Sequence, residues 1–397
     1  MIRMSNEDYL SIGQEVVMKN VGRLPVVFSR GEGSRLWDSN GKEYLDFLCG
    51  ISVNNFGHCH PEITAALTAQ AGKILHVSNY FYLEEQIKLA QELIKLSNYH
   101  SVFFANSGAE ANEAAIKLAR KYGKTKLSGA YQIITAKKSF HGRTLGALSA
   151  TGQPKYQESF QPVVPGFVYA DYNNLKSWLG AITEQTCALM LELVQGEGGV
   201  YPANPDFIEG LARICYKYKL LLIIDEVQTG LGRTGKMFAY ENYNIKPDII
   251  TIAKSLGGGV PCGALLVDEE ADIFTPGDHS TTIGGGGMAY AAGLATLRLL
   301  QEPGFLDEVL RKGNYIKDTW EYWRREMPVI NGSRGLGLML ALDLKVPSKQ
   351  VMLACLEEGL VVNAVSENSI RILPALNISR EDLDAGLAIL KKVLQQL

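Results

Sequence analysis

The stretch PDIITIAKSLGGG, residues 247–259, joins an apolar strand to a charged side chain and a glycine-rich loop. Three β-branched isoleucines lie on both faces of the strand, a pattern typical of an interior strand of a parallel sheet. Lys254 follows this strand almost at once. Because ligands bind at the carboxyl ends of the strands in open parallel sheets, Lys254 is the first candidate functional residue.

Strands and helices alternate on the N-terminal side of this stretch. The predicted strands are SVFFA (101–105), YQIITA (131–136), CALMLELV (187–194) and LLLIID (220–225), and the predicted helices are SGAEANEAAIKLARKYG (107–123) and PDFIEGLARICYKY (205–218). Helical spacing of apolar residues also occurs in residues 61–74 and 83–97. This order predicts an α/β fold with a mainly parallel sheet wrapped by helices.

The two ends of the chain have a different character. Residues 31–53 are expected to form short antiparallel strands with a turn at Ser39–Gly41, and the C-terminal third is expected to be a small α+β unit. We therefore predict a large domain at residues 61–287 and a small C-terminal domain at residues 288–397. The N-terminal segment, residues 1–60, is expected to join the small domain through its hairpin.

Composition excludes several classes of protein. The 397 residues are 46% hydrophobic and 20% charged with a formal net charge of -3, which favours neither nucleic acid nor an acidic membrane surface as a partner. No apolar run is long enough to span a bilayer, and MIRMSNEDYL lacks the apolar region of a secretory signal. Six scattered cysteines without a C-x-x-C pair indicate reduced thiols. We expect a soluble, cytoplasmic protein.

Two further strand ends carry unusual residues. Ser107, Gly108 and Ala109 lie between a strand and a long helix, where Ser107 and Glu110 fit a capping box and the same geometry fits a phosphate site. Asp225 ends an apolar strand, where a carboxylate is costly unless donors or a cation meet it. It fits a turn cap or an arginine pair, but together with Lys254 it suggests two groups that act on one cofactor.

Three loops add polar or aromatic candidates for a functional site. Each also has a structural explanation, which is core packing, a surface charge or a flexible loop. Phe140 and Arg143 together suit a flat ring beside a carboxylate-bearing substrate. Glu197 lies in a glycine-rich turn after another strand. Thr281 and Thr282 precede four glycines.

Other site types fit the sequence less well. GLGRTGKM, residues 230–237, nearly matches a nucleotide P-loop but has Met237 where a magnesium-binding hydroxyl is required. GHCHP, residues 57–61, has no further histidine or cysteine ligands at zinc-like spacing, so a turn is favoured over a metal site. No G-x-G-x-x-G follows a strand, which disfavours a nicotinamide cofactor.

The motifs, taken in order, resemble those of the fold-type I, class III aminotransferases that use pyridoxal 5'-phosphate. They are FLCGISVNNFGHCHP, FFANSGAEANEAAIKLAR, SFHGRTLGALSATG, LELVQGEGGV, LLIIDEVQTGLGRTG, DIITIAKSLGGGVPCGA and IRILPAL, and they span nearly the whole chain. Within this class the chain is most similar to the acetylornithine aminotransferase branch. The resemblance implies the fold of these enzymes, a large cofactor-binding domain with a smaller α+β domain.

The resemblance also implies roles for the cofactor-binding residues. Lys254 would hold the cofactor covalently and move the substrate proton, and Asp225 would keep the pyridine nitrogen protonated. The remaining contacts would come from Gln228 at the phenolic oxygen, Val227 and Phe140 on the two ring faces, Ser107, Gly108 and Ala109 at the phosphate, and Thr282 of a second subunit. A homodimer with shared active sites is therefore implied.

The implied reaction moves the terminal amino group of N-acetylornithine to 2-oxoglutarate, a step of arginine biosynthesis. Arg143 would bind the donor's carboxylate, and Arg371 the second carboxylate of 2-oxoglutarate. Glu197 would neutralise Arg371 when the donor is bound, and Thr281 would touch the donor. Succinylornithine, ornithine, 4-aminobutyrate or an acyl-lysine-pathway amine are alternative donors, and a catalytically silent interaction protein is the alternative outside enzymes.

The chain departs from the family pattern at two places, three residues in all. Gly286 and Gly287 stand where the family usually has Asn-Pro, and Leu193 stands where proline usually follows Glu192. The first departure affects the loop that is expected to cross to the second subunit.

Overall fold

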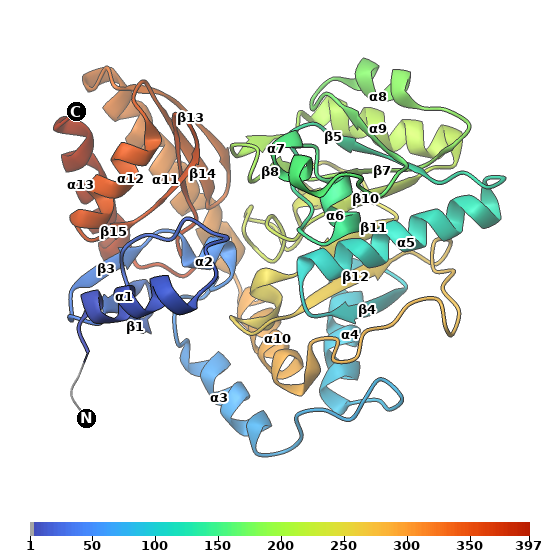
Figure 1. Ribbon diagram of the computed structural model, residues 1–397, viewed down its shortest axis with the longest axis horizontal. Helices are drawn as coiled ribbons and strands as arrows, with labels where there is room; N and C mark the ends of the chain where they lie inside the picture. The colour runs from blue at the N-terminus through green and yellow to red at the C-terminus, as the bar shows by residue number, and fades with distance from the viewer. Residues whose placement is uncertain (1–3) are drawn as a thin grey trace.

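The computed structural model describes residues 4–397, which form two regions of different size built on separate sheets (Figure 1). Residues 1–3 of the predicted N-terminal segment lie outside the described residues. The blue N-terminal and red C-terminal segments lie together on the left of Figure 1, and the green and yellow middle of the chain forms the region on the right.

The larger region is built on a seven-stranded sheet. Its strands, in spatial order, are β4 (Ser101–Ala105), β12 (Gly263–Val267), β11 (Ile249–Ile252), β10 (Leu221–Asp225), β7 (Thr186–Leu191), β5 (Gln132–Ala136) and β6 (Phe167–Ala170). β12 is antiparallel to both of its neighbours, and every other pair in the sheet is parallel. The prediction of a mainly parallel sheet is confirmed.

Both faces of this sheet are buried, as the β-branched strands predict. In β10, Leu221 and Ile223 pack into the core beneath α5 (Gly108–Lys126), while Leu222 and Ile224 pack into the core beneath α9 (Pro205–Tyr218). Alternate side chains of a strand point to opposite faces, so each interior strand needs apolar residues at successive positions. Polar side chains can therefore reach a ligand only where the strands end.

Two strands of this sheet, β6 and β12, were absent from the sequence analysis. Both are runs of four or five residues, FVYA and GALLV, and periodicity over so short a run does not separate a strand from a loop. The backbone of β12 runs close to the start of α5. A Cβ on Gly263 would lie only 2.4 Å from the carbonyl oxygen of Ser107. A glycine at this point lets the two segments touch.

Further helices surround the seven-stranded sheet. They are α3 (Pro61–Ala71), α4 (Glu84–Ser97), α6 (Leu145–Ala150), α7 (Pro154–Gln157), α8 (Leu175–Ala181) and α10 (Gly286–Leu300). α10 packs against α3 and α4, and also contacts the short 3-10 helix η3 (Lys254–Gly257) that begins at the candidate lysine. No helix within residues 4–397 is long and apolar enough to cross a membrane.

The smaller region combines the two ends of the chain. One sheet has the order β1 (Phe28–Glu32), β2 (Arg35–Asp38), β3 (Glu43–Asp46), β15 (Leu360–Val361), and the other has the order β13 (Ile330–Leu336), β14 (Met339–Leu344), β17 (Ser369–Ile372), β16 (Asn363–Ser366). The helices of this region are α1 (Asn6–Val16), α2 (Cys49–Ser52), α11 (Phe305–Glu326), α12 (Ser348–Glu357) and α13 (Arg380–Gln395). The pairing of β3 with β15 ties the N-terminal hairpin to the C-terminal segment. The fold class is confirmed, while the domain limits at residues 60 and 287 stay a prediction.

Candidate active site

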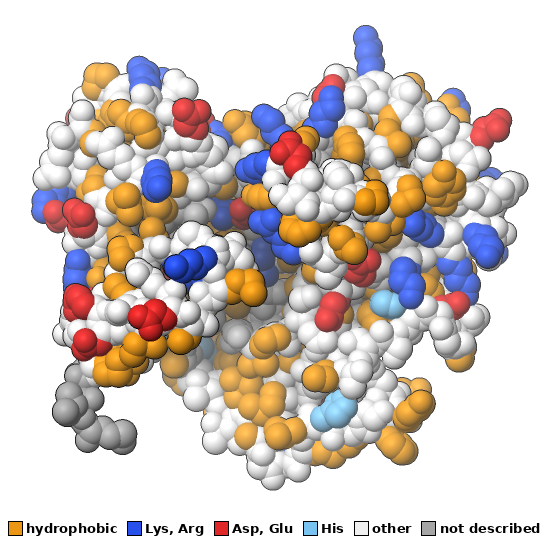
Figure 2. Space-filling view, viewed as in Figure 1, with side chains coloured by type: hydrophobic (Ala, Val, Ile, Leu, Met, Phe, Trp, Pro, Cys, Tyr) orange, Lys and Arg blue, Asp and Glu red, His pale blue; other side chains and the backbone are white. Residues whose placement is uncertain are grey.

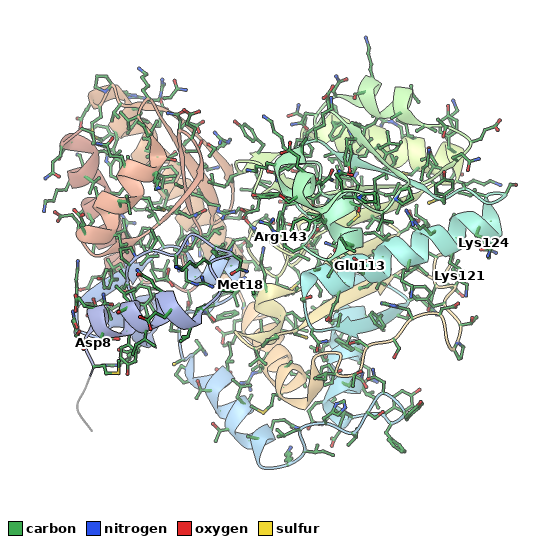
Figure 3. All side chains as sticks on the ribbon, in the orientation of Figure 1. Asp8, Met18, Glu113, Lys121, Lys124 and Arg143 are labelled. Atoms are coloured by element: carbon green, nitrogen blue, oxygen red, sulfur yellow. The ribbon has the colours of Figure 1, made fainter. Side chains whose placement is uncertain are left out.

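A cavity of about 460 Å³ lies at the carboxyl ends of β10 and β11. The sequence-predicted residues that line it are Ser107, Gly108, Ala109, Phe140, Arg143, Glu197, Asp225, Val227, Gln228 and Lys254. Figure 2 shows a furrow between the two regions of the molecule, with Lys and Arg side chains gathered along it. Figure 3 places Arg143 at this furrow, on the side of the larger region. The structure therefore brings ten of the predicted residues to one cavity.

The carboxylate of Asp225 is buried, and three neighbouring residues fix its orientation. Its Oδ2 accepts a hydrogen bond from Nδ2 of Asn112 at 2.8 Å and lies 2.8 Å from Nδ1 of His141, while Oδ1 accepts from the backbone N–H of Val227 at 3.0 Å. The Val227 contact is the turn cap that the sequence allows. The other two partners hold the carboxylate toward the cavity, an arrangement that a cap alone does not require.

Lys254 combines an unusual backbone with a shifted pKa. Its φ is 50°, in the left-handed region that few non-glycine residues adopt. Burial lowers the pKa of the Lys254 amine to about 8, although Glu197 and Asp225 favour its charged form. A lysine with such a pKa is partly deprotonated near neutral pH, and only the free base attacks a carbonyl. Strain and a shifted pKa at one residue are typical of a functional site.

The N-terminus of α5 is capped differently from the prediction. Oγ of Ser107 accepts from the N–H of Glu110 at 3.2 Å, as a capping box requires. The Glu110 carboxylate, however, accepts from the N–H of Asn106 at 2.6 Å instead of from that of Ser107. The reciprocal capping box is therefore wrong, because the glutamate reaches one residue further back.

The same helix end can bind an anion. A Cβ on Gly108 would lie 2.6 Å from Cγ1 of Val227, so the glycine lets the first turn of α5 approach the cavity wall. The N–H groups of Gly108 and Ala109 belong to the first turn, where a helix has no intrahelical acceptors for them. They line the cavity at the positive end of the helix dipole, which favours a phosphate.

Arg371 lies behind the cavity wall, where it forms an ion pair with Glu197. The side chain is fully buried on β17, and Nη1 donates to Oε1 of Glu197 at 2.7 Å and to Oε1 of Gln228 at 3.2 Å. Nη2 donates to Oδ1 of Asn363 at 2.8 Å. Burial acts to raise the pKa of Glu197, but the charges of Arg371 and Lys254 and the hydrogen bonds from Arg371 and Gln228 together outweigh it, and the pKa is lowered. Glu197 is therefore charged at neutral pH.

Arg143 is exposed at the entrance of the cavity. Its guanidinium lies 4.0 Å from the ring centre of Tyr156 and 5.4 Å from that of Phe140. Stacking on two rings keeps a guanidinium in place while its N–H groups stay available to a carboxylate. Phe140 is only half-buried and lines the cavity. A residue whose role is only to fill the core would be fully buried, so this alternative interpretation of Phe140 does not fit.

The two threonines lie outside the cavity lining. Thr281 accepts a hydrogen bond from Nδ2 of Asn106 at 3.2 Å, and Asn106 does line the cavity. Thr282 is exposed. The predicted contacts of Thr281 with a donor and of Thr282 with a second subunit stay predictions.

Glycines at the family's Asn-Pro position have a local explanation. The N–H of Gly287 donates to the carbonyl oxygen of Leu75 at 3.1 Å, and a Cβ on Gly287 would lie 2.8 Å from the carbonyl oxygen of Ile74. Proline could not donate this hydrogen bond. The first turn of α10 is thus held against the loop after α3 by contacts that need glycine. Leu193, the other departure, is fully buried in the main core.

Three residues of the site were missed in the sequence analysis. Asn112 and His141 hold Asp225, and Glu192 accepts from the N–H groups of Phe140 at 3.0 Å and Gly196 at 3.1 Å. Burial raises the pKa of Glu192 to about 7. Glu192 directly follows the buried strand β7, so the reasoning that found Asp225 could also have found it. Asn112 could have been noticed as a polar residue on the apolar face of α5.

The alternative motifs have structural roles. Arg233, in the P-loop-like segment, is fully buried and donates to Ser52, Asn55 and the carbonyl oxygens of Leu338 and Pro374. It thereby joins the N-terminal segment to the C-terminal one. His58, in GHCHP, pairs with Asp46 at 2.8 Å. No cluster within residues 4–397 has the three His, Cys, Asp or Glu side chains that could hold a metal ion.

Comparison with known families identifies the class of enzyme. Residues 16–394 match the family described as aminotransferase class-III. The chain belongs to this family. Class-III aminotransferases depend on pyridoxal 5'-phosphate, so the protein is an aminotransferase that acts on small molecules with this cofactor.

Similar proteins cover nearly the whole chain. The acetylornithine aminotransferase of Caldanaerobacter subterraneus subsp. tengcongensis is 46% identical over 97% of this chain and 98% of its own, and that of Methanocaldococcus jannaschii is 44% identical over 99% and 100%. Among solved structures, the ornithine aminotransferase of Toxoplasma gondii has a TM-score of 0.95 at 31% identity, covering 99% of this chain and 96% of its own. The acetylornithine aminotransferase of Elizabethkingia anophelis has a TM-score of 0.88 at 32% identity, covering 99% and 100%.

The residues of the cavity fit the cofactor. Lys254 offers a partly deprotonated amine, Asp225 offers a fixed carboxylate, and the first turn of α5 offers free N–H groups on a third side. A Cβ at Gly108 would fill the passage between α5 and Val227. These groups match an aldehyde, a ring nitrogen and a phosphate, which are the three polar ends of pyridoxal 5'-phosphate.

Replacing Asp225 with asparagine tests its assignment. Asp225→Asn keeps the shape of the side chain but removes the negative charge that would hold a proton on the ring nitrogen. We expect turnover to fall by about 100-fold or more, the scale seen when an electrostatic contact in the reacting site is removed. Cofactor retention, measured by absorbance after gel filtration, should change far less. Near-normal turnover would make Asp225 a structural cap.

Glu226 offers a matched control for this experiment. It is also buried, but its carboxyl group accepts from the N–H groups of Ala239 and Tyr240 and does not line the cavity. Burial raises its pKa to about 8, so this group is already largely neutral at pH 7. Glu226→Gln should leave the turnover of the folded protein close to that of the wild type.

Proposed function

We propose that the protein transfers the terminal amino group of N-acetylornithine to 2-oxoglutarate, giving N-acetylglutamate semialdehyde and glutamate. The observation that carries this proposal is the ion pair of the buried Arg371 with the half-buried Glu197, beside a cavity that has a second arginine, Arg143, at its entrance. Relatives that are 40–46% identical over almost the full chain and bear the name acetylornithine aminotransferase support it. The proposal includes a cytoplasmic location and a role in arginine biosynthesis.

Lys254 and Asp225 would perform the central proton chemistry. Bound pyridoxal 5'-phosphate supplies an aldehyde that accepts the amino group and a ring that withdraws electrons from the substrate. Lys254, with a pKa of about 8, would take the proton from the carbon that bears the reacting amine. It would then deliver this proton to C4', the aldehyde carbon of the cofactor. Asp225 would hold a proton on the ring nitrogen, supported by His141 and Asn112.

The remaining residues around the cavity would fix the position of the cofactor. The N–H groups of Gly108 and Ala109 would bind its phosphate, with Ser107 holding the helix start as its N-cap. Val227 and Phe140 would cover the two faces of the ring, and Gln228 would lie at its phenolic oxygen. All of these residues line the same cavity.

The two arginines would divide the work of carboxylate binding. Arg143 is exposed and would bind the single carboxylate of N-acetylornithine, while Glu197 keeps the charge of Arg371 neutralised. When 2-oxoglutarate binds, its second carboxylate would replace Glu197 at Arg371. A bidentate arginine–carboxylate contact is strong and directional, so it decides which end of a substrate meets the cofactor. Thr281 would touch the donor from the loop next to Asn106.

A homodimer is part of the proposal. An apolar surface, made of Leu75, Tyr80, Phe81, Tyr82 and Ile283, is exposed in the single chain, with Tyr80 at 93% and Tyr82 at 85% exposure. Its two segments are joined by a hydrogen bond from Asn79 to the carbonyl oxygen of Thr281. Figure 2 shows hydrophobic side chains gathered over α10 and the loop between α3 and α4. Contiguous apolar surface favours a protein interface, and Thr282 lies beside Ile283, where it could reach a partner's phosphate.

Ornithine is the second candidate donor. Solved ornithine aminotransferases match the fold with TM-scores up to 0.96, but at 31% identity. Succinylornithine, 4-aminobutyrate and an acyl-lysine-pathway amine would use the same arginines. A methylene or two in a pocket changes binding by only about 1–3 kcal/mol, so chain length alone separates these donors only weakly.

A panel of amino donors tests the proposed substrate. The purified enzyme should be assayed with 2-oxoglutarate and N-acetylornithine, succinylornithine, ornithine, 4-aminobutyrate or an acyl-lysine-pathway amine. We expect the highest kcat/KM with N-acetylornithine. A higher kcat/KM with another member would reassign the donor while leaving the aminotransferase activity intact.

Variants of the ion pair test the division of carboxylate binding. Glu197→Ala should slow the half-reaction with N-acetylornithine and favour glutamate as donor, because Arg371 is then always free for a second carboxylate. Arg371→Ala should weaken 2-oxoglutarate and spare the donor step, because Arg143 remains. A charge-assisted hydrogen bond is worth about 1.5–3 kcal/mol, so each change should be about tenfold or more. Single-turnover spectra separate the half-reactions, and equal damage to both in Glu197→Ala would contradict the proposed role.

A further inference from the structure

Glu197 lies in a turn that its own sequence does not make rigid. The turn joins β8 (Val194–Gln195) to β9 (Tyr201–Pro202) and consists of Gly196, Glu197, Gly198, Gly199 and Val200. Three of its five residues are glycines, which have the greatest backbone freedom. The turn is closed by a hydrogen bond from the N–H of Val200 to the carbonyl oxygen of Gln195 at 2.8 Å, and contacts outside the turn add to this restraint and fix where Glu197 points.

The two ends of this turn are held by different regions of the molecule. At Gly196, the backbone N–H donates to Glu192 of the larger region at 3.1 Å. At Gly199, the backbone carbonyl accepts from both Nε and Nη2 of Arg334 on β13, with the Nε contact at 2.8 Å. β13 lies against β9.

Arg334 is itself firmly placed. Its Nη1 pairs with the carboxylate of Asp343, Nη2 donates to Oγ of Ser369 at 3.2 Å, and the guanidinium lies 4.0 Å from the ring centre of Tyr201. The side chain is only 14% exposed. A guanidinium with this many partners gives the Gly199 carbonyl a fixed point of attachment.

Arg334 and Arg371 act from the same face of one sheet. Arg334 pairs with Ala341 on β14, and Ala341 pairs with Arg371 on β17. Residues in register across a sheet point to the same side, so both cations face the turn that carries Glu197. One arginine binds the carboxylate of Glu197 and the other binds the backbone two residues further on.

We infer that Arg334 is a specificity-determining positioning residue, which holds the turn so that Glu197 covers Arg371 when a monocarboxylate donor is bound. The inference rests on the proposed roles of Glu197 and Arg371. When a dicarboxylate binds, the Glu197 side chain leaves Arg371 while Gly199 stays attached to Arg334. The turn then returns Glu197 to the same place. Without Arg334 the glycine-rich turn becomes more mobile, and Glu197 pairs with Arg371 for less of the time. Arg371 is then more often free to bind a second carboxylate.

A double-mutant cycle tests this inference on the holoenzyme. The measured quantity is the ratio of kcat/KM for N-acetylornithine, which has one carboxylate, to kcat/KM for glutamate, which has two. Arg334→Gln should lower this ratio by about three- to tenfold, the size expected for coupled side chains in one network. In a Glu197→Ala background the same substitution should leave the ratio unchanged, because no glutamate remains to be positioned.

Two further variants serve as controls. Arg334→Lys keeps a positive charge beside Asp343 but cannot donate two hydrogen bonds to Gly199, so it should lower the ratio less than Arg334→Gln does. It takes the place of Arg334→Gln in the cycle if that variant does not fold. Arg380→Gln removes an exposed arginine of α13 that pairs with Asp384, and it should leave the ratio unchanged.

The outcomes separate this inference from the proposed function. If Glu197→Ala shifts the ratio and Arg334→Gln does not, the roles of Glu197 and Arg371 stand and the inference is wrong. An equal shift by Arg334→Gln in both backgrounds also overturns the inference, since Arg334 would then act without Glu197. If Glu197→Ala itself leaves the ratio unchanged, the proposed switch at Arg371 is wrong, and the inference fails with it.

Discussion

The amine of Lys254 lies at the end of a strand that is apolar on both faces, and burial there lowers its pKa to about 8. The seven-stranded sheet creates this environment, because helices cover both of its faces and leave charged groups only at the strand ends. The same constraint explains why Asp225 is the last residue of β10 and why Glu192 directly follows β7. Each polar group in such a place needs partners, and the partners determine its orientation.

The partners around the cavity come from both regions of the chain. Asn112 and His141 of the larger region fix Asp225, whereas Arg371 of the C-terminal sheet fixes Glu197. The carboxylate switch thus lies where the two regions meet, which is also where the furrow of Figure 2 runs. Arg371 lies on β17 and Glu197 in the turn between β8 and β9, so the pair can open without disturbing either core. Loss of Glu197 would leave the buried guanidinium of Arg371 without its ion-pair partner.

The sequence predicted most of the fold because the strands of the large sheet are apolar on both faces and alternate with helices. It missed β6 and β12, whose four or five residues carry no usable periodicity. Lys254, Asp225 and the start of α5 could be predicted because each follows an apolar strand. His141 and Asn112 could not be found in this way, since their importance comes from contacts with Asp225, which is 84 and 113 residues away along the chain. The reciprocal capping box at Ser107 was wrong, because Glu110 accepts from the N–H of Asn106 and not from that of Ser107.

The central claim is that Lys254 is the residue that binds the cofactor covalently. Borohydride treatment of the purified holoenzyme, followed by proteolysis and peptide mass spectrometry, tests it directly. We expect a pyridoxyl group on the peptide that contains Lys254, and none on the corresponding peptide of Lys254→Ala. A pyridoxyl group on any other lysine of the wild-type enzyme would contradict this assignment.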